Sequence, residues 1–200
     1  MSKKGNKEAL IEVGLELISS TGYAATGINQ ILDAAETRSF YSYFTNKEQF
    51  VIEVIKLYVA FGHQHMEQKM SDSSLSPLQK LRMYFEDMIA THGRRGGPIK
   101  GCLLGNLSLE VAGQNKEIRN ILRESFDGWQ RAIAITIQDA VDNGELPPTT
   151  KVNELASVIV DSWQGAQVRA KTEQDDKPLR LFLDSTFNVL LRFNTRVHLQ

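Results

Sequence analysis

The side chain most suited to covalent chemistry is the thiol of Cys102, the only cysteine of the chain. It follows Gly101 and precedes a mostly apolar run, LLGNLSLEV, that predicts a short helix. A thiol at the start of a helix lies at the positive end of the helix dipole, which favours the nucleophilic thiolate. The alternative is a buried, inert cysteine, which is the commoner fate of a lone cysteine.

General acid–base chemistry has few candidates. They are His63, His65 and His92, with Glu67 or Glu86 as a carboxylate partner. His63 and His65 are two residues apart, so they cannot share one face of a helix. The chain has no nucleophile elbow, no cysteine–histidine cluster at zinc spacing, no Walker loop and no GxGxxG motif. The sequence therefore predicts neither an enzyme nor a metal or cofactor site.

The composition is that of an ordinary globular protein. Of the 200 residues, 42% are hydrophobic and 24% are charged, enough for one or two domains with a substantial core. No run of about eighteen apolar residues exists, so no transmembrane helix and no membrane partner are expected. The polar N-terminus lacks a signal-peptide pattern. A single cysteine excludes an internal disulfide and fits a reducing cytoplasm.

Apolar residues recur at helical spacing along most of the chain, with almost no strand pattern. Thr21-Gly22 is a stop signal, because glycine tolerates the left-handed conformation that ends many helices. Asn46, Ser76 before Pro77, and Asn115 are start signals. The sequence predicts an all-α fold with about nine helices, over residues 5–20, 27–34, 37–43, 47–70, 77–92, 101–112, 115–143, 151–172 and 177–194.

Residues 22–50, GYAATGINQILDAAETRSFYSYFTNKEQF, are the most informative stretch. They predict a short helix, a tight turn, a second short helix and the capped start of a long helix. Two short helices joined by a tight turn can project one of them into the major groove of DNA. Residues 1–56 carry six basic and seven acidic side chains, a net charge of −1, which counts mildly against phosphate binding. DNA binding is still the leading interpretation.

The same stretch resembles the DNA-binding domain of TetR/AcrR-family transcriptional regulators. The matching residues are Gly22-Tyr23, Ala25-Thr26, Ile28 to Ala35, and Ser39-Phe40-Tyr41-Ser42-Tyr43-Phe44 followed by Asn46-Lys47-Glu48. The motif-level resemblance covers residues 7–56, and the remaining helical chain agrees in architecture. The resemblance implies a helix-turn-helix DNA-binding domain at residues 1–50 and an effector-binding and dimerisation domain at residues 51–200.

The resemblance also implies which side chains contact DNA. Thr26 would start the first short helix, where its hydroxyl and backbone amides can hold a phosphate, and Lys47 would bind a phosphate at the start of the long helix. The second short helix would form or flank the rest of the contact surface with Thr37, Arg38, Ser39, Tyr41, Ser42 and Tyr43. The alternative for the two tyrosines is packing within the small domain, and Phe40 and Phe44 are predicted core residues.

The turn between the two short helices departs from the family pattern. The family usually has A-G-V-x-K-G-S-x-Y there, whereas residues 35–41, AETRSFY, are about two residues shorter and lack the Lys-Gly pair. A real deletion would alter the angle between the helices and weaken or retarget DNA binding. Alternatively, the two residues are missing only from the sequence at hand. Arg38 is a candidate to replace the lost lysine.

The rest of the chain is similar to NemR-type and AcuR-type repressors through the run KGCLLGNLSLEV at residues 100–111. NemR-like repressors respond to electrophiles and oxidants through a cysteine of this run, and Cys102 occupies the matching position. Lys171 matches a lysine of the same proteins that could stabilise a thiolate; the alternative is a solvated lysine near a helix C-terminus. The family also dimerises through its last two helices, here residues 151–172 and 177–194, whose apolar stripes could equally be intrachain core.

Aromatic side chains on the body helices are candidates for a ligand pocket, above all Trp129 and Trp163, because a buried indole needs a hydrogen-bond partner. Such stripes are otherwise usually core. The sequence predicts a homodimeric, cytoplasmic repressor that binds a palindromic operator on double-stranded DNA. A small-molecule or electrophilic effector acting on the body would release it. The alternative is a helical ligand-binding protein whose DNA binding is impaired by the short turn.

Overall fold

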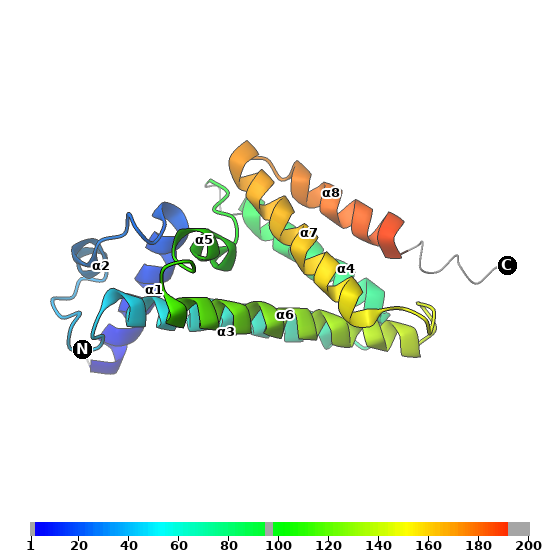
Figure 1. Ribbon diagram of the computed structural model, residues 1–200, viewed down its shortest axis with the longest axis horizontal. Coiled ribbons are helices and arrows are strands. Elements are labelled where there is room, and N and C mark those ends of the chain that lie inside the picture. The colour runs from blue at the N-terminus through cyan, green and yellow to red at the C-terminus, as the bar shows by residue number, and fades with distance from the viewer. Residues whose placement is uncertain (1–2, 95–97, 192–200) are drawn as a thin grey trace. The chain divides into compact units, whose positions relative to one another are not determined.

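The computed structural model describes residues 3–94 and 98–191, and within these ranges the chain is helical and contains no strand (Figure 1). Its helices are α1 (Lys3–Thr21), α2 (Ile28–Ala34), α3 (Lys47–Met70), α4 (Pro77–Arg94), α5 (Leu103–Glu110), α6 (Lys116–Asp142), α7 (Val152–Glu173) and α8 (Lys177–Ser185). A π-helical segment, Thr186–Leu190, continues α8. The predicted all-α fold is confirmed, with eight α-helices in the described ranges where nine were expected.

Local capping contacts form where the sequence predicts them. Asn46 caps α3 by accepting a hydrogen bond from the N–H of Gln49 at 2.8 Å. Asn115 caps α6 in the same way, with the N–H of Ile118 at 2.9 Å. Gly22 follows α1 with a φ of +92°, in the left-handed region that favours glycine. These helix ends depend on neighbours in the sequence, which is why the sequence alone predicts them.

The helix predicted over residues 37–43 is wrong, because these residues form bends and a single turn. The chain leaves α2 through Glu36, which has a φ of +48° although it is not a glycine. The N–H of Thr37 then bonds to the carbonyl of Leu32 at 3.1 Å. This hydrogen bond closes a Schellman motif, which turns the chain away from the helical path.

One hydrogen-bonded turn takes the place of the missing helix. In it the carbonyl of Phe40 accepts hydrogen bonds from the N–H groups of Tyr43 at 3.0 Å and Phe44 at 3.1 Å. Phe40 and Phe44 are both buried, as predicted. The described chain runs without interruption from the end of α2 to the cap of α3, so this is the structure of the shortened turn. Too few residues remain there to close the turn, bury both rings and still form a regular helix.

Two compact units make up the chain. The first comprises Met1–Gly62 with Lys100–Phe126, and the second comprises His63–Ile99 with Asp127–Gln200. α3 and α6 contribute residues to both units. None of the described helices is long and apolar enough to cross a bilayer. The boundary at residue 50 between a DNA-binding and an effector-binding domain stays a prediction.

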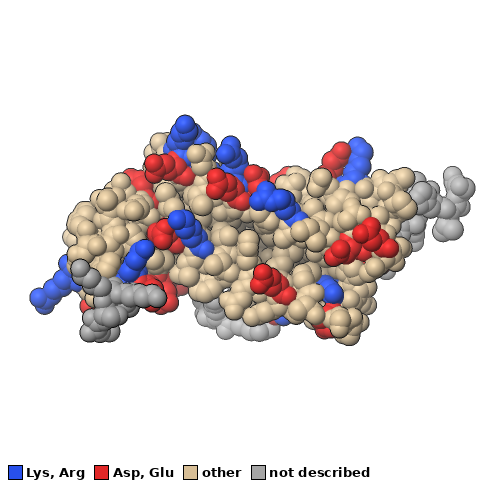
Figure 2. Space-filling model, turned by 90° about the horizontal axis from the view of Figure 1, so that it is seen from below, with Lys and Arg blue, Asp and Glu red and all other residues tan. Residues whose placement is uncertain are grey.

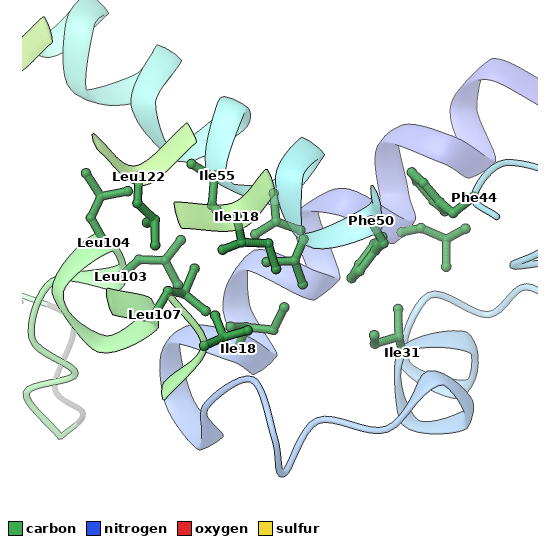
Figure 3. Packing of buried hydrophobic residues seen from close by; sticks show 14 of the residues in the cluster. Ile18, Ile31, Phe44, Phe50, Ile55, Leu103, Leu104, Leu107, Ile118 and Leu122 are labelled. Atoms are coloured by element: carbon green, nitrogen blue, oxygen red, sulfur yellow. The ribbon is translucent and has the colours of Figure 1, made fainter. Parts of the chain in front are cut away.

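The core of the first unit combines side chains from five helices (Figure 3). Buried members from α1, α2, α3, α5 and α6 include Ile18, Ile31, Phe50, Leu107 and Ile118, respectively. α1 approaches α3 at Gly14, where a Cβ atom would lie 2.2 Å from the ring of Phe50. Burying each large apolar side chain contributes about 1.5–3 kcal/mol, so this shared core fixes α2 and α5 against α1 and α3.

The second unit has an aromatic core. Phe85 of α4, Trp163 of α7 and Phe182 of α8 pack with ring centroids 5.0–5.1 Å apart. α8 contacts both α4 and α7. The predicted helix over residues 177–194 is therefore present as α8 and its π-helical continuation, and residues 192–194 lie outside the described residues.

Candidate DNA-binding and sensor sites

The residues predicted to form the recognition helix stand on the irregular segment between α2 and α3. Tyr41 is the most exposed, at 72%, and its ring lies edge-on to Phe40 with 5.4 Å between the centroids. The others are exposed (Arg38 and Ser42) or partly buried (Thr37, Ser39 and Tyr43). The hydroxyls of Ser39 and Ser42 form a hydrogen bond with each other. Presentation of these groups therefore depends on the turn and not on a helix.

Thr26, predicted to hold a phosphate, is fully buried. Its hydroxyl donates to the carbonyl of Gly22 at 2.7 Å and lies 2.9 Å from the hydroxyl of Thr21. α2 begins beyond it, at Ile28. Thr26 thus closes the loop of residues 22–27, which we call the α1–α2 turn. A phosphate contact by its hydroxyl stays a prediction and would require this turn to open.

Lys47 is engaged with the α1–α2 turn. Its ammonium donates to the carbonyl of Tyr23 and lies 4.2 Å from the centroid of the Tyr23 ring. Desolvation lowers the pKa of Lys47, against the opposing effect of the Glu48 and Glu110 charges. The hydroxyl of Tyr23 donates to Glu48 at 3.2 Å, and burial together with that carboxylate raises the pKa of Tyr23 to about 12. The phosphate contact of Lys47 stays a prediction.

Glu110, the last residue of α5, holds the same turn from another side, and sequence reasoning missed it. Its Oε2 accepts hydrogen bonds from the backbone N–H of Tyr23 at 2.8 Å and of Ala24 at 3.1 Å. Gly22 permits this approach, because a Cβ atom there would lie 2.6 Å from Oε1. The partners are 86 and 87 residues apart, so no local pattern could reveal the contact.

Cys102 is the N-cap residue of α5, at the helix start that the sequence predicts. The residue is buried, with 8% of its surface exposed, and the hydroxyl of Tyr58 donates to its Sγ at 3.7 Å. The ammonium of Lys100, the nearest cation in the sequence, is paired with Glu16 of α1. The thiol therefore sits where α5 meets α1 and α3, within the first unit.

The other predicted effector residues belong to the second unit. Lys171 is exposed in the last turn of α7. Trp163 is 1% exposed and packs against Phe85 and Phe182, so its ring is part of the core. The indole N–H of Trp129 is buried and has no hydrogen-bond partner, which leaves a donor for a bound group. An approach of Lys171 to the thiol and ligand contacts by either tryptophan stay predictions.

Of the acid–base candidates, His65 pairs with Asp87, a carboxylate that the sequence analysis did not single out. Nε2 of His65 lies 2.7 Å from a carboxylate oxygen of Asp87, and the Lys69 ammonium lies 3.5 Å from the same oxygen. The hydrogen bond with His65 lowers the pKa of Asp87. His63 is exposed, and the side chain of His92 lies outside the described residues. Within the described ranges, no three histidine, cysteine or acidic side chains gather as they would around a metal ion.

The charge distribution offers no broad basic surface on the face seen in Figure 2. Lysine and arginine side chains there are interspersed with aspartate and glutamate. The net charge of the whole chain is −1. Attraction to the phosphate backbone would therefore come from a few placed contacts and not from the overall field.

Comparison with known proteins defines the class of protein. Residues 10–54 match the family described as "Bacterial regulatory proteins, tetR family". Residues 77–186 match the family described as "Tetracyclin repressor-like, C-terminal domain". The chain therefore belongs to the TetR family of DNA-binding transcriptional regulators.

Three similar proteins place it within the family. The chain is 36% identical over 180 residues to the transcriptional regulator AcuR of Cereibacter sphaeroides, covering 88% of this chain and 80% of AcuR. It is 25% identical over 190 residues to the transcriptional repressor NemR of Escherichia coli, covering 92% and 93%. A crystal structure of a regulatory protein TetR from Rhodobacter sphaeroides superposes with a TM-score of 0.84 at 33% identity, covering 90% of this chain and 95% of that one.

Proposed function

We propose that this protein is a homodimeric repressor that binds a palindromic operator and releases it when an electrophile or oxidant modifies Cys102, or when a small ligand binds the body. The position of Cys102 carries the proposal. Cys102 occupies the N-cap position of α5, and α5 contacts α1 within the unit that also contains α2. A change at the thiol therefore acts on a helix that touches the DNA-binding element directly.

The burial of Cys102 explains how a small modification could have a large effect. The thiol is 8% exposed and in contact with the hydroxyl of Tyr58. Protein interiors are close-packed, so a group added to Sγ requires α5 or its neighbours to move. The unmodified thiol favours one arrangement of the unit and the modified thiol another, which is the two-state behaviour that a regulator needs.

The test is DNA binding with and without a thiol reagent. Fluorescence anisotropy on duplex DNA from upstream of the gene would compare the wild type with Cys102→Ser, before and after N-ethylmaleimide. The thiolate adds to the maleimide double bond, a C–S bond forms, and the neighbouring carbon takes up a proton. We expect both proteins to bind with a salt-dependent affinity and only the wild type to lose affinity after the reagent.

Two results would count against the proposal. Full loss of binding by Cys102→Ser after N-ethylmaleimide would exclude the thiol mechanism. Absence of specific binding by a folded wild-type dimer would exclude the operator-binding part, whatever the reagent does.

Exposed apolar residues on the last two helices support the homodimer. Val158 and Val168 of α7 and Leu181 of α8, with Val189 of the π-helical segment, are 46–58% exposed. A second copy packed on these helices would cover them. Leu181→Glu should yield a monomer in light scattering, whereas Ile135→Glu, at a slightly more exposed position on α6, should stay dimeric. A dimeric Leu181→Glu protein would place the interface elsewhere.

A second candidate function is ligand binding with impaired DNA binding. Residues 37–43 form no regular helix, and the buried indole N–H of Trp129 has no hydrogen-bond partner. The first observation weakens major-groove recognition, and the second favours a polar ligand in the body. The same anisotropy titration separates the two functions, because only the repressor should prefer operator DNA over unrelated DNA at moderate salt.

A further inference from the structure

α5 has a functional group at each end. Cys102 occupies the N-cap position at its start, and Glu110 is its last residue. Between them Leu103, Leu104 and Leu107 are buried in the core of the first unit, so the helix is anchored along its length (Figure 3). A short anchored helix moves as a whole, so a displacement at the thiol end reaches the carboxylate end.

The carboxylate of Glu110 binds the α1–α2 turn like an anion in a backbone cradle. The N–H groups of Tyr23 and Ala24 are adjacent in the chain, and both point at Oε2, at 2.8 Å and 3.1 Å. Successive N–H groups that converge in a turn form a concave anion site. We call these two hydrogen bonds the Glu110 contact. It ties α5 to the segment from which α2 starts.

α3 holds the opposite side of the same turn. The Lys47 ammonium binds the carbonyl of Tyr23, and the Tyr23 hydroxyl binds Glu48. The backbone N–H of Tyr23 is thus bound by α5, whereas its carbonyl and its side chain are bound by residues of α3. Loss of the contacts with α5 would free the turn to move relative to α5, and loss of the contacts with α3 would free it to move relative to α3.

We infer that Glu110 is a positioning residue that sets the place of α2 for DNA binding and passes movements of α5 to the DNA-binding element; this inference rests on the DNA-binding function proposed above. Release of the Glu110 contact shifts the unit toward the form with low DNA affinity. Cys102 modification reaches α2 through this contact.

The direction in which DNA affinity changes when the Glu110 carboxylate is removed distinguishes a positioning role from a purely electrostatic one. Removing the Glu110 carboxylate makes the protein less acidic, which by itself strengthens attraction to the phosphate backbone. Loss of positioning weakens binding instead. Glu124 of α6 is an exposed carboxylate in the same unit, so Glu124→Ala measures the charge effect alone.

The experiment compares the full-length wild type with Glu110→Ala, Glu110→Gln and Glu124→Ala. Operator affinity is read by fluorescence anisotropy, and backbone exchange by hydrogen–deuterium NMR at Tyr23, Ala24 and α2. We expect Glu110→Ala to bind about tenfold more weakly than Glu124→Ala and to exchange faster at the turn and through α2. Glu110→Gln retains one carbonyl acceptor and should fall between. These two hydrogen bonds are exposed, so water can hydrate the freed N–H groups and the variants should fold.

Each result decides the inference. If Glu110→Ala binds the operator within twofold of Glu124→Ala, and the exchange of Tyr23, Ala24 and α2 is unchanged, the inference is overturned. If the wild type shows no specific DNA binding, the proposed function fails but the positioning role is still decided by exchange. Faster exchange through Ile28–Ala34 in Glu110→Ala would then support the positioning role, and unchanged exchange would refute it. If the alanine variant does not fold, Glu110→Gln is measured in its place.

Discussion

At Gly22 the end of α1 and the Glu110 contact both disfavour an added side chain. The φ of Gly22, +92°, is in the left-handed region, where an alanine costs about 1–2 kcal/mol. An alanine Cβ would also lie 2.6 Å from Oε1 of Glu110, so the carboxylate would have to withdraw. Hydrogen bonds to a charged group contribute roughly 1.5–3 kcal/mol when shielded, and exposure of this pair reduces its share to about 1 kcal/mol.

Gly22→Ala should therefore lower the free energy of unfolding by about 2–3 kcal/mol, the sum of the backbone and contact contributions. For a chain of this size the melting temperature would fall by about 4–12 °C. Gly62→Ala is the matched control, because Gly62 lies within α3 and faces open space. That change should raise stability by up to about 1 kcal/mol, since alanine is the better helix former.

A double-mutant cycle separates the two contributions. Glu110→Ala alone removes the contact, and Gly22→Ala already displaces it. The double variant should then be about as unstable as Gly22→Ala alone, with a coupling of about 1 kcal/mol between the two sites. Urea unfolding of the four proteins measures this coupling. Additivity within roughly 0.3 kcal/mol would show that an alanine side chain leaves the Glu110 contact undisturbed, and unchanged stability of Gly22→Ala would refute the backbone argument.

Three further changes probe the two units. Burial raises the pKa of Tyr23 from 10.0 to about 12, so the stability it contributes is fully present below pH 10 and is lost as the pH rises toward 12. Urea unfolding of Tyr23→Phe should show a smaller loss than the wild type over that range, and an equal loss would contradict the argument. Trp163→Ala removes a side chain that is 1% exposed and should cost about 3–5 kcal/mol in thermal unfolding; a cost below about 1 kcal/mol would place the ring outside the core. The hydrogen bond with His65 holds the pKa of Asp87 below its usual 3.8, so its contribution is present above that pH and is lost as the pH falls through the folded-state pKa. The stability difference between the wild type and Asp87→Asn, measured from about pH 6 down to about pH 3, should shrink, and a widening difference would reverse the assigned sign.

In the shortened turn, local sequence patterns were not sufficient to predict the backbone conformation. The aromatic residues of segment 37–43 have helical spacing, and the family pattern has a helix there. In the structure Phe40 and Phe44 are buried as predicted, but one turn delivers both rings to the core. The residue types predicted that Phe40 and Phe44 would be buried, whereas the length of chain between α2 and α3 determined the backbone conformation.

The candidate DNA contacts were predicted from residue types, but tertiary packing determines which of their side chains are exposed. Lys47 and Thr26 carry groups that suit phosphate, and nothing in the sequence distinguishes a lysine that faces DNA from one that binds a neighbouring carbonyl. In the structure Lys47 binds Tyr23, and Thr26 is buried within the α1–α2 turn. Tyr41 and Arg38 remain on the surface.

The amino-acid sequence was sufficient to predict the helical class, most helix ends and the position of Cys102 at the start of a helix. These depend on apolar periodicity and on capping partners within about four residues, which a linear chain displays directly. Tertiary packing was needed to show that Glu110 binds Tyr23 and Ala24, that Lys100 pairs with Glu16, and that the thiol contacts Tyr58. Each of these contacts joins segments far apart in the chain, and their geometry follows from how the shared core packs α5 against α1 and α3.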